Sequence, residues 1–353
     1  MNPSPSAGAS RPSPADPALD PGCPGPLELQ TGISVVIPVY NSASTLGQLV
    51  EQLAAVLPQD AERFEVVLVN DGSQDASWQL VRELAARYAW VRGFNLMRNY
   101  GQHNALLCGI RSARFSVTVT MDDDLQHPPT EIRKLLAELD KGFDVVYGTP
   151  AKEQHGLWRN VASQLTKLAM QSAIGVNNAR YVSAFRAFRT TARQAFSDHA
   201  GPFVSLDVVL SWATSRFSHV PVEIAPRPSG KSNYTFGKLV VHALTMMTGY
   251  STLPLRLSAV IGFTFTLFGV GMLVYVIGLF FLEGGSSVPG FPFLASIISI
   301  FSGAQLFALG IMGEYLARMH FRMMERPTYT IREVIVERVA VDARRTSDGS
   351  QVE

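Results

Sequence analysis

The sequence predicts an α/β fold with a mostly parallel sheet, followed by two membrane-spanning helices. Between residues 32 and 149, short runs of apolar, often β-branched residues alternate with segments of helical periodicity. Such alternation is typical of parallel sheets whose strands are joined by helical crossovers. Toward the C-terminus, residues 257–282 and 284–313 contain no charged side chain. Each of these two runs is long enough to cross the hydrocarbon core of a bilayer.

The expected strands share an apolar run that ends at a turn or helix signal. They are residues 33–37, 64–69, 91–96, 117–121 and 143–147. The helices between them share an apolar spacing of three and four residues and are expected over 44–57, 76–88, 104–112 and 129–141. Two further amphipathic helices, expected over 158–174 and 236–250, are either ordinary packed helices or helices at the membrane interface.

The first 30 residues differ in composition from the rest of the chain. They are rich in Pro, Ser, Ala and Gly and lack the apolar core of a signal peptide, so we expect a disordered tail. The whole chain carries a formal net charge of +1, which gives no basic field for nucleic acid. Cys23 and Cys108 show neither disulfide nor metal spacing and fit a reducing, cytoplasmic setting.

The charges around the two apolar runs predict their orientation in a membrane. Arg256 precedes the pair and Arg318 follows it, whereas the connection 283–292 contains no Lys or Arg. The positive-inside rule therefore places both ends of the chain in the cytoplasm. The expected parts are a tail (1–30), a globular domain (31–235), an interfacial helix (236–256), two spanning helices (257–282 and 293–317) and a cytoplasmic C-terminal tail (318–353).

Three adjacent carboxylates, Asp122, Asp123 and Asp124, follow the expected strand 117–121. Adjacent carboxylates repel one another, and oxygen ligands suit a hard divalent ion such as Mg²⁺ or Mn²⁺. Because alternate residues of a strand share a face, Asp122 and Asp124 are expected to converge while Asp123 points elsewhere. Magnesium is usually held by one or two carboxylates together with substrate phosphates. The cluster therefore predicts a metal-bridged diphosphate, and the alternative is a solvated acidic turn with Asp124 as a helix cap.

Polar residues also follow the first two expected strands, at 38–41 and 70–73. Ligands of such sheets bind beyond the carboxyl ends of the strands, so three polar clusters at equivalent ends indicate one binding site. No Gly-x-Gly-x-x-Gly follows the first strand, which disfavours a dinucleotide cofactor.

These clusters resemble motifs of the inverting GT-A glycosyltransferases of family two that transfer sugars to polyprenyl phosphate. The matching stretches are Pro-Val-Tyr-Asn at 38–41, Val-Asn-Asp-Gly-Ser at 69–73 and Asp-Asp-Asp-Leu-Gln-His-Pro-Pro at 122–129. This group includes dolichyl-phosphate mannose synthases, bactoprenol glucosyltransferases and undecaprenyl-phosphate aminoarabinose transferases. Residues 95–103 resemble the aminoarabinose type most. The resemblance covers about 33–336 and includes further stretches at 185–189, 230–234, 254–257, 313–318 and 326–329.

The resemblance implies a GT-A fold and a nucleotide-diphosphate sugar as donor, with uridine diphosphate expected first and guanosine diphosphate second. It also implies a polyprenyl phosphate acceptor in the lipid bilayer and Mg²⁺ or Mn²⁺ as cofactor. Relatives form tetramers, so a homo-oligomer is expected. The expected location is a bacterial inner membrane with the catalytic domain on the cytoplasmic side.

The resemblance also assigns roles to individual residues. Those expected around the nucleotide base and ribose are Pro38, Tyr40, Asn41 and Asp71. Those expected along the donor pocket are Arg98, Asn99, Gly101 and Gln102. Asp122 and Asp124 would hold the metal, with Gln126 adding an oxygen, and Arg186 would contact a donor or acceptor phosphate, since guanidinium suits phosphate. A second phosphate cluster is expected at Arg227, Lys231 and Ser232. Asp122, Asp124 and Arg186 are the expected catalytic residues.

Three positions depart from the family pattern. Ser42 stands where relatives often carry Glu, and Asn233 stands where aminoarabinose-type relatives carry Lys, for which Lys231 would compensate. Arg180 stands near a position where relatives carry an Asp sometimes proposed as a catalytic base. A phosphate monoester has a second pKa of about 6 and is largely ionised at neutral pH, so this acceptor needs no base. Arg180 would then hold the lipid phosphate.

Two other functions remain open from the sequence. A processive polysaccharide synthase is disfavoured because the chain has no Gln-x-x-Arg-Trp stretch and only two expected spans. A catalytically inactive, nucleotide-sugar-binding membrane scaffold is favoured by the missing carboxylate near Arg180 and disfavoured by the intact acidic cluster.

Overall fold

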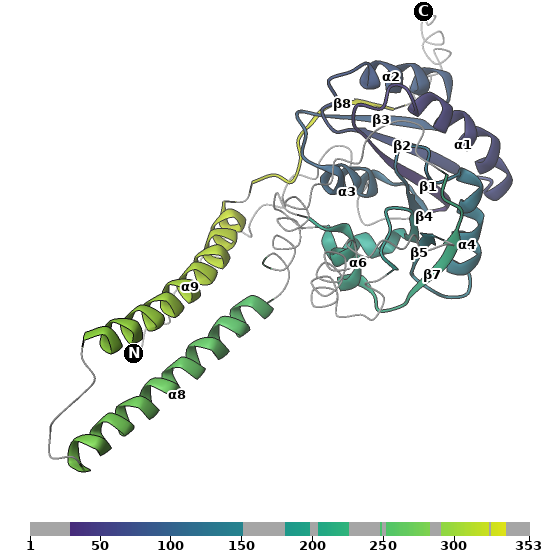
Figure 1. Ribbon diagram of the computed structural model, residues 1–353. Helices are drawn as coiled ribbons and strands as arrows, with labels where there is room; N and C mark the ends of the chain where they lie inside the picture. Colours follow the sequence, from purple (N-terminus) through teal and green to yellow (C-terminus); the bar gives the residue numbers. More distant parts are fainter. Residues whose placement is uncertain are drawn as a thin grey trace, which may run out of the picture.

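The computed structural model describes residues 29–150, 181–197, 204–225, 248, 252–282, 291–324 and 326–336. Together they form an α/β domain from which a hairpin of two long helices projects (Figure 1). The helix expected over 158–174, and all but one residue of the helix expected over 236–250, lie outside the described residues.

Four parallel strands form the centre of the sheet. The first strand pairs on one side with the second and on the other with the fourth, and the second also pairs with the third. Their carboxyl ends therefore meet at one edge of the sheet. The bounds are close to those expected from the apolar runs: β1 (Gln30–Val39), β2 (Phe64–Asn70), β3 (Val91–Leu96) and β4 (Phe115–Thr120).

Further strands extend this centre, so that the described residues form one eight-stranded mixed sheet in the order β7-β5-β6-β4-β1-β2-β3-β8. β6 (Arg186–Arg189) lies antiparallel between β4 and β5 (Val145–Pro150), and β7 (Phe217–Val222) pairs parallel with β5. The sheet is mostly parallel, as predicted.

Helices cover both faces of the sheet because the strands alternate their side chains between two apolar clusters. Val35 and Ile37 of β1 pack in one cluster, and Val36 packs in the other. The first cluster is covered by α1 (Leu46–Asp60), α2 (Ser77–Arg87) and α4 (Ile132–Leu139), the last preceded by the 3₁₀ helix η1 (Pro129–Glu131). The second is covered by α3 (Gln102–Ser112), η3 (Thr190–Phe196) and α6 (Leu206–Ala213).

The C-terminal end of the chain differs from the expected tail. Residues 331–335, expected within the tail 318–353, form strand β8 (Ile331–Ile335), which pairs antiparallel with β3 at the edge of the sheet. The strand is short and carries two adjacent charged side chains, Arg332 and Glu333, so its sequence contains no apolar run that would predict it. The chain thus returns to the α/β domain after its long helices.

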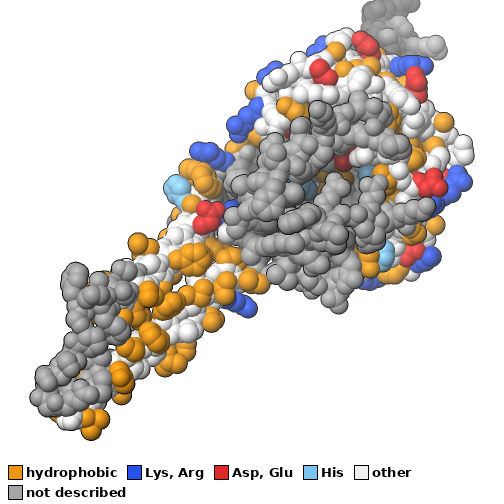
Figure 2. Space-filling model, in the orientation of Figure 1, with side chains coloured by type: hydrophobic (Ala, Val, Ile, Leu, Met, Phe, Trp, Pro, Cys, Tyr) orange, Lys and Arg blue, Asp and Glu red, His pale blue; other side chains and the backbone are white. Residues whose placement is uncertain are grey.

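The projecting hairpin consists of α8 (Leu253–Leu282) and α9 (Phe291–Met323), which extend beyond the expected spans 257–282 and 293–317. The rings of Phe265 and Phe301 meet between the two helices with centroids 5.8 Å apart. Stretches of both helices, Leu253–Met272 and Ile300–Phe321, are long and apolar enough to cross a membrane. Figure 2 shows hydrophobic side chains over the hairpin and most of the charged ones over the α/β domain. The expected two-helix hairpin is confirmed.

Candidate active site

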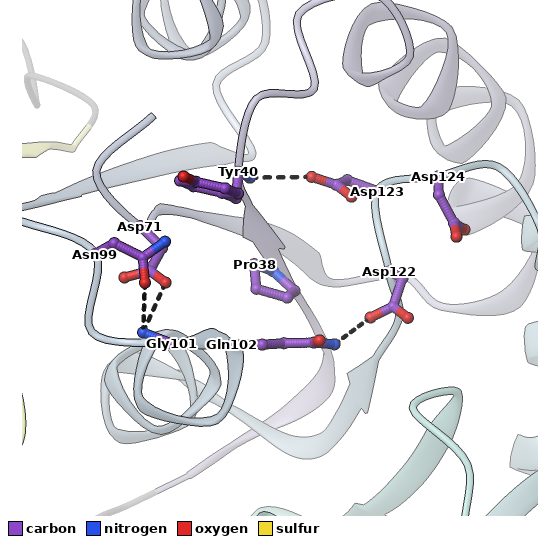
Figure 3. A pocket seen from close by; sticks show the side chains of 9 residues that line it. All are labelled: Pro38, Tyr40, Asp71, Asn99, Gly101, Gln102, Asp122, Asp123 and Asp124. Atoms are coloured by element: carbon purple, nitrogen blue, oxygen red, sulfur yellow. Dashed lines mark hydrogen bonds between the residues drawn. The ribbon is translucent and has the colours of Figure 1, made fainter. Parts of the chain in front are cut away.

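A pocket lies at the carboxyl ends of β1, β2 and β4 (Figure 3). It encloses about 250 Å³. All but one of its lining residues were predicted as site residues from the sequence, and the exception is Asp123. The lining residues are Pro38, Tyr40, Asp71, Asn99, Gly101, Gln102, Asp122, Asp123 and Asp124.

Asp71 forms one wall of the pocket and fixes the neighbouring loop. Its two carboxylate oxygens accept hydrogen bonds from the backbone N–H groups of Tyr100, at 2.7 Å, and Gly101, at 2.9 Å. Burial raises the pKa of the Asp71 carboxyl, and the two N–H donors oppose that rise. Gly72 follows with φ of +68°, and a Cβ there would lie 2.5 Å from the backbone N of Asn99. Only glycine therefore allows this close approach.

Asp123 contributes to the pocket, contrary to the expectation that it points elsewhere. Its carboxylate accepts hydrogen bonds from the Tyr40 N–H, at 3.2 Å, and from the Ser42 hydroxyl. Burial raises the pKa of the Asp123 carboxyl, while these two donors lower it. The expectation was wrong because β4 ends at Thr120, so the acidic cluster is a turn to which strand alternation does not apply. Ser42, a departure from the family pattern, thus holds this carboxylate.

Asp122 and Asp124 line the pocket as predicted, each with its own hydrogen-bond donor. The side-chain amide of Gln102, at the start of α3, donates to Asp122 at 2.6 Å, as Figure 3 shows. The backbone N–H of Gln126 donates to Asp124 at 3.1 Å. Gln126 is next to the acidic cluster but is not a lining residue.

The donor set of this wall fits a metal that is shared with a ligand. Among the described residues, no three His, Cys, Asp or Glu side chains form a group that could hold an ion by themselves. Mg²⁺, however, is usually bound by one or two carboxylates plus substrate phosphates. Asp122 and Asp124 offer hard oxygen ligands of that kind at the pocket wall. They fit Mg²⁺ or Mn²⁺ bound together with a diphosphate.

Two predicted pocket residues do not line the pocket. The Asn41 side-chain oxygen accepts a hydrogen bond from the Gln74 backbone N–H at 2.8 Å, and the Asn41 backbone N–H donates to the Ser73 hydroxyl at 3.0 Å. Asn41 thereby joins the loops that follow β1 and β2. The Arg98 guanidinium lies over the ring of Tyr100, 4.8 Å from its centroid.

Arg186 is buried and is not among the residues that line the pocket. It is 2% exposed, forms an ion pair with Asp207 of α6, and donates from Nε to the Thr120 hydroxyl at 3.1 Å. The Tyr147 hydroxyl donates to the same Asp207 carboxylate at 3.0 Å. Burial, with the Asp207 charge next, raises the pKa of Tyr147 well above its usual value. The described arrangement does not show the predicted phosphate contact, because the Arg186 guanidinium is ion-paired with Asp207. Sequence reasoning missed this pair because its members belong to no common motif.

The remaining predicted contacts, Arg180, Arg227, Lys231 and Ser232, lie outside the described residues. Ala225, the last described residue before one of these gaps, donates its N–H to the Gln126 carbonyl at 2.8 Å. The chain therefore passes beside the acidic cluster at residue 225.

Comparison with known proteins gives consistent matches. Residues 34–198 match the model of glycosyl transferase family 2. The undecaprenyl-phosphate 4-deoxy-4-formamido-L-arabinose transferase of Pseudomonas savastanoi pv. phaseolicola is 34% identical over 86% of this chain and 90% of that protein. The protein of the same name from Pseudomonas aeruginosa (strain LESB58) is 33% identical over 88% and 92%.

Solved structures match part of the chain at lower identity. The structure of S. aureus TarS in complex with UDP is 16% identical, with a TM-score of 0.44, and the match covers 62% of this chain and 64% of that chain. Glucosyl-3-phosphoglycerate synthase from Mycobacterium tuberculosis, in complex with Mn²⁺, UDP and glucosyl-3-phosphoglycerate, is 16% identical, with a TM-score of 0.46 over 62% and 78%.

Proposed function

The chain belongs to glycosyl transferase family 2, and we propose that it transfers a sugar from a nucleotide-diphosphate sugar to polyprenyl phosphate at the cytoplasmic face of a membrane. The resemblance to polyprenyl-phosphate glycosyltransferases drawn from its motifs is confirmed. Uridine diphosphate is the first expected donor nucleotide and guanosine diphosphate the second. The reaction proceeds with inversion and requires Mg²⁺ or Mn²⁺.

One observation carries this proposal: carboxylates from the ends of separate strands meet in one pocket of an α/β sheet. Asp71 follows β2 and the acidic cluster follows β4, yet both line the same cavity beside Tyr40. Ligands of parallel sheets bind at this edge. Tyr40 is 47% exposed and offers an aromatic face to a nucleotide base.

Different residues of the pocket would bind the donor and stabilise the leaving diphosphate. Asp71 holds residues 100 and 101 of the loop after β3 in place, so that Asn99 and Gly101 line the donor site. Asp122 and Asp124 would hold a divalent ion, which when bound neutralises charge on the leaving diphosphate. Gln102 orients Asp122 for that task, and Ser42 holds the neighbouring Asp123 carboxylate.

Bond making and breaking need little proton transfer in this scheme. An oxygen of the lipid phosphate attacks the anomeric carbon from the face opposite the diphosphate, and a new C–O bond forms. The bond between that carbon and the diphosphate oxygen breaks, and the nucleoside diphosphate leaves with the electron pair. Because the acceptor phosphate is already ionised, positioning and charge stabilisation carry the catalysis.

The helical hairpin explains how a lipid acceptor reaches this site. Two apolar stretches long enough to cross a bilayer follow the α/β domain, and the start of α8 and the end of α9 both lie toward that domain (Figure 1). Arg256 and Arg318 flank these stretches, so the positive-inside rule favours a cytoplasmic domain. A bacterial inner membrane and a homo-oligomer complete the proposal.

A non-catalytic scaffold is the second candidate, favoured because the sequence has no carboxylate between residues 177 and 181. The acidic wall of the pocket argues against it, since a scaffold has no need of a metal–diphosphate site. A processive synthase is less well supported, because two spans are few for a pore that translocates a sugar chain.

A transfer assay separates these functions. Purified full-length protein in detergent is incubated with undecaprenyl phosphate, Mg²⁺ or Mn²⁺, and a panel of UDP- and GDP-linked sugars. The panel includes 4-deoxy-4-formamido-L-arabinose, the sugar in the relatives' names. Mass spectrometry of the lipid fraction is expected to show one metal-dependent glycosyl phosphoryl lipid. Nucleotide binding without a lipid product from any donor would favour the scaffold.

A further inference from the structure

A short loop between β3 and α3, residues 97–101, forms the pocket wall that carries Asn99 and Gly101. One end of this loop is held from inside the pocket. Asp71 accepts the N–H groups of Tyr100 and Gly101, and the Asn104 side chain donates to the Tyr100 carbonyl at 2.7 Å. These three bonds fix residues 100 and 101 but do not reach Met97.

The other end of the loop is held by the C-terminal segment, residues 326–336. The Met97 N–H donates to the Thr330 carbonyl at 2.9 Å, and Arg332 Nη2 donates to the Met97 carbonyl at 3.0 Å. The Met97 side chain is 50% exposed, so burial of that side chain does little to hold the loop. Both hydrogen-bonding groups of the Met97 backbone are therefore satisfied by a segment more than two hundred residues away in sequence.

The C-terminal segment is itself attached at several points to the α/β domain. Glu333 accepts two hydrogen bonds from Arg82, at 2.6 and 2.8 Å, and one from the Trp78 indole at 3.2 Å. The ring of Tyr329 packs against the apolar cluster beneath α3 and lies 5.8 Å from the Arg111 guanidinium. The segment is thus a fixed support and not a loose end.

The same segment is joined directly to the membrane hairpin. The helix α9 ends at Met323 and β8 begins at Ile331, so only the connection 324–330 separates the second apolar helix from the support of the pocket wall.

We propose that the C-terminal segment positions the 97–101 loop for donor binding, with Arg332 as the positioning residue, and so links the second membrane helix to the nucleotide pocket. The inference rests on the proposed function, because it takes the pocket to bind a nucleotide-diphosphate sugar. Arg332 does not line the pocket and acts on the donor only through the Met97 backbone.

The test compares donor affinity in full-length variants in detergent. The probes are UDP and GDP with Mg²⁺, titrated calorimetrically, followed by the KM and kcat of transfer with the better nucleotide. In Arg332→Ala, the Kd and the donor KM are expected to rise about threefold to tenfold with kcat little changed, since a charged hydrogen bond to the loop is lost. Arg332→Lys keeps a cationic donor and is expected to recover part of the affinity.

The matched control is Arg82→Ala, which removes an ion pair from the same strand but leaves Met97 untouched. It is expected to leave the nucleotide Kd unchanged. A wild-type Kd in Arg332→Ala would overturn the proposal, because the strand would then act only on stability. An equal loss of affinity in Arg82→Ala would overturn the role assigned to Arg332, because any loosening of the strand would then weaken binding. Should Arg332→Ala fail to fold, Arg332→Gln is judged by the same criteria.

The measurements distinguish a failure of the proposed function from a failure of the role assigned to Arg332. If wild-type protein binds neither UDP nor GDP, the pocket is not a nucleotide site and both proposals fall. If wild-type protein binds and transfers normally while Arg332→Ala matches it in Kd and KM, only the positioning role is lost.

Discussion

Two polar clusters lie side by side at the end of β4 and use their charges in different ways. In the pocket, the acidic residues after β4 are partly accessible and accept hydrogen bonds from an amide, a hydroxyl and backbone N–H groups. Beside it, Arg186 and Asp207 are 2% and 3% exposed and neutralise each other. Thr120 belongs to both, since it binds Arg186 and precedes the acidic turn by two residues. The difference supports the proposal that one cluster serves a ligand, while the other holds the frame around it.

The largest effect is expected from the accessible cluster. Replacing Asp124 with Asn removes a charged metal ligand, and turnover is expected to fall at least about a thousandfold, because metal and charge stabilisation contribute several kcal/mol to catalysis. The thermal midpoint should stay near that of the wild type. Asp140→Asn is the matched control, since its side chain is 78% exposed and does not line the pocket. Normal transfer by Asp124→Asn would rule out the metal assignment.

The buried cluster is expected to respond in stability rather than in chemistry. Arg186→Met leaves the Asp207 carboxylate buried without its ion pair, which should lower the free energy of unfolding by about 3–5 kcal/mol. The double variant Arg186→Met/Asp207→Leu removes both charges and is expected to regain part of that loss. Thermal and denaturant unfolding in detergent measure both. Lost transfer with unchanged stability would instead support the phosphate contact predicted for Arg186 from the sequence.

The two clusters also show which parts of the structure can be predicted from the sequence. β1 to β5 were predicted because apolar residues recur within each and a turn or helix signal follows, and Asp71 and the acidic cluster because they follow two of these strands. β6 and β8 were not, since Arg-Ala-Phe-Arg and Ile-Arg-Glu-Val-Ile are short, carry two charged residues each and depend on partners far along the chain. The Arg186–Asp207 pair is likewise a non-local contact that no short motif encodes. Local pattern thus predicts the site wall, and tertiary pairing decides what surrounds it.

Donor binding is expected to depend on pH through the Asp71 carboxyl in the pocket. Burial raises the pKa of Asp71 above its usual 3.8, so on acidification this carboxyl takes up its proton earlier than an ordinary aspartate. The protonated group is a poorer acceptor for the Tyr100 and Gly101 N–H groups, and nucleotide affinity should therefore weaken as pH falls toward that raised pKa. The folded state binds this proton more tightly than the unfolded chain does. The contribution of Asp71 to folding stability consequently decreases as pH rises through the same window, opposite in sign to its effect on binding.

Asp71→Asn is the variant that isolates this titration. It is expected to weaken nucleotide binding about tenfold at neutral pH, because a charged acceptor of two backbone hydrogen bonds is lost. Its affinity should no longer depend on pH in the range where Asp71 titrates. The measurement is the Kd of UDP with Mg²⁺ across pH in both proteins. An identical acid limb in wild type and variant would show that another group titrates there.

The smallest effect is expected at Ser42. Its neutral hydroxyl donates a hydrogen bond to the Asp123 carboxylate, whereas the Asp207 carboxylate is paired with the full positive charge of Arg186. Removing it in Ser42→Ala deletes one hydrogen bond to a partly buried carboxylate, worth about 1 kcal/mol, and the nucleotide Kd should rise about twofold to fivefold. The pKa of Asp123 should rise further, since the Ser42 hydroxyl is among the donors that lower it. Ser42→Thr keeps the hydroxyl and should bind like the wild type. Equal affinities in all three proteins would mean that the backbone N–H of Tyr40 alone fixes Asp123. The hydroxyl at residue 42 could then be removed without loss, unlike the charge of Arg186.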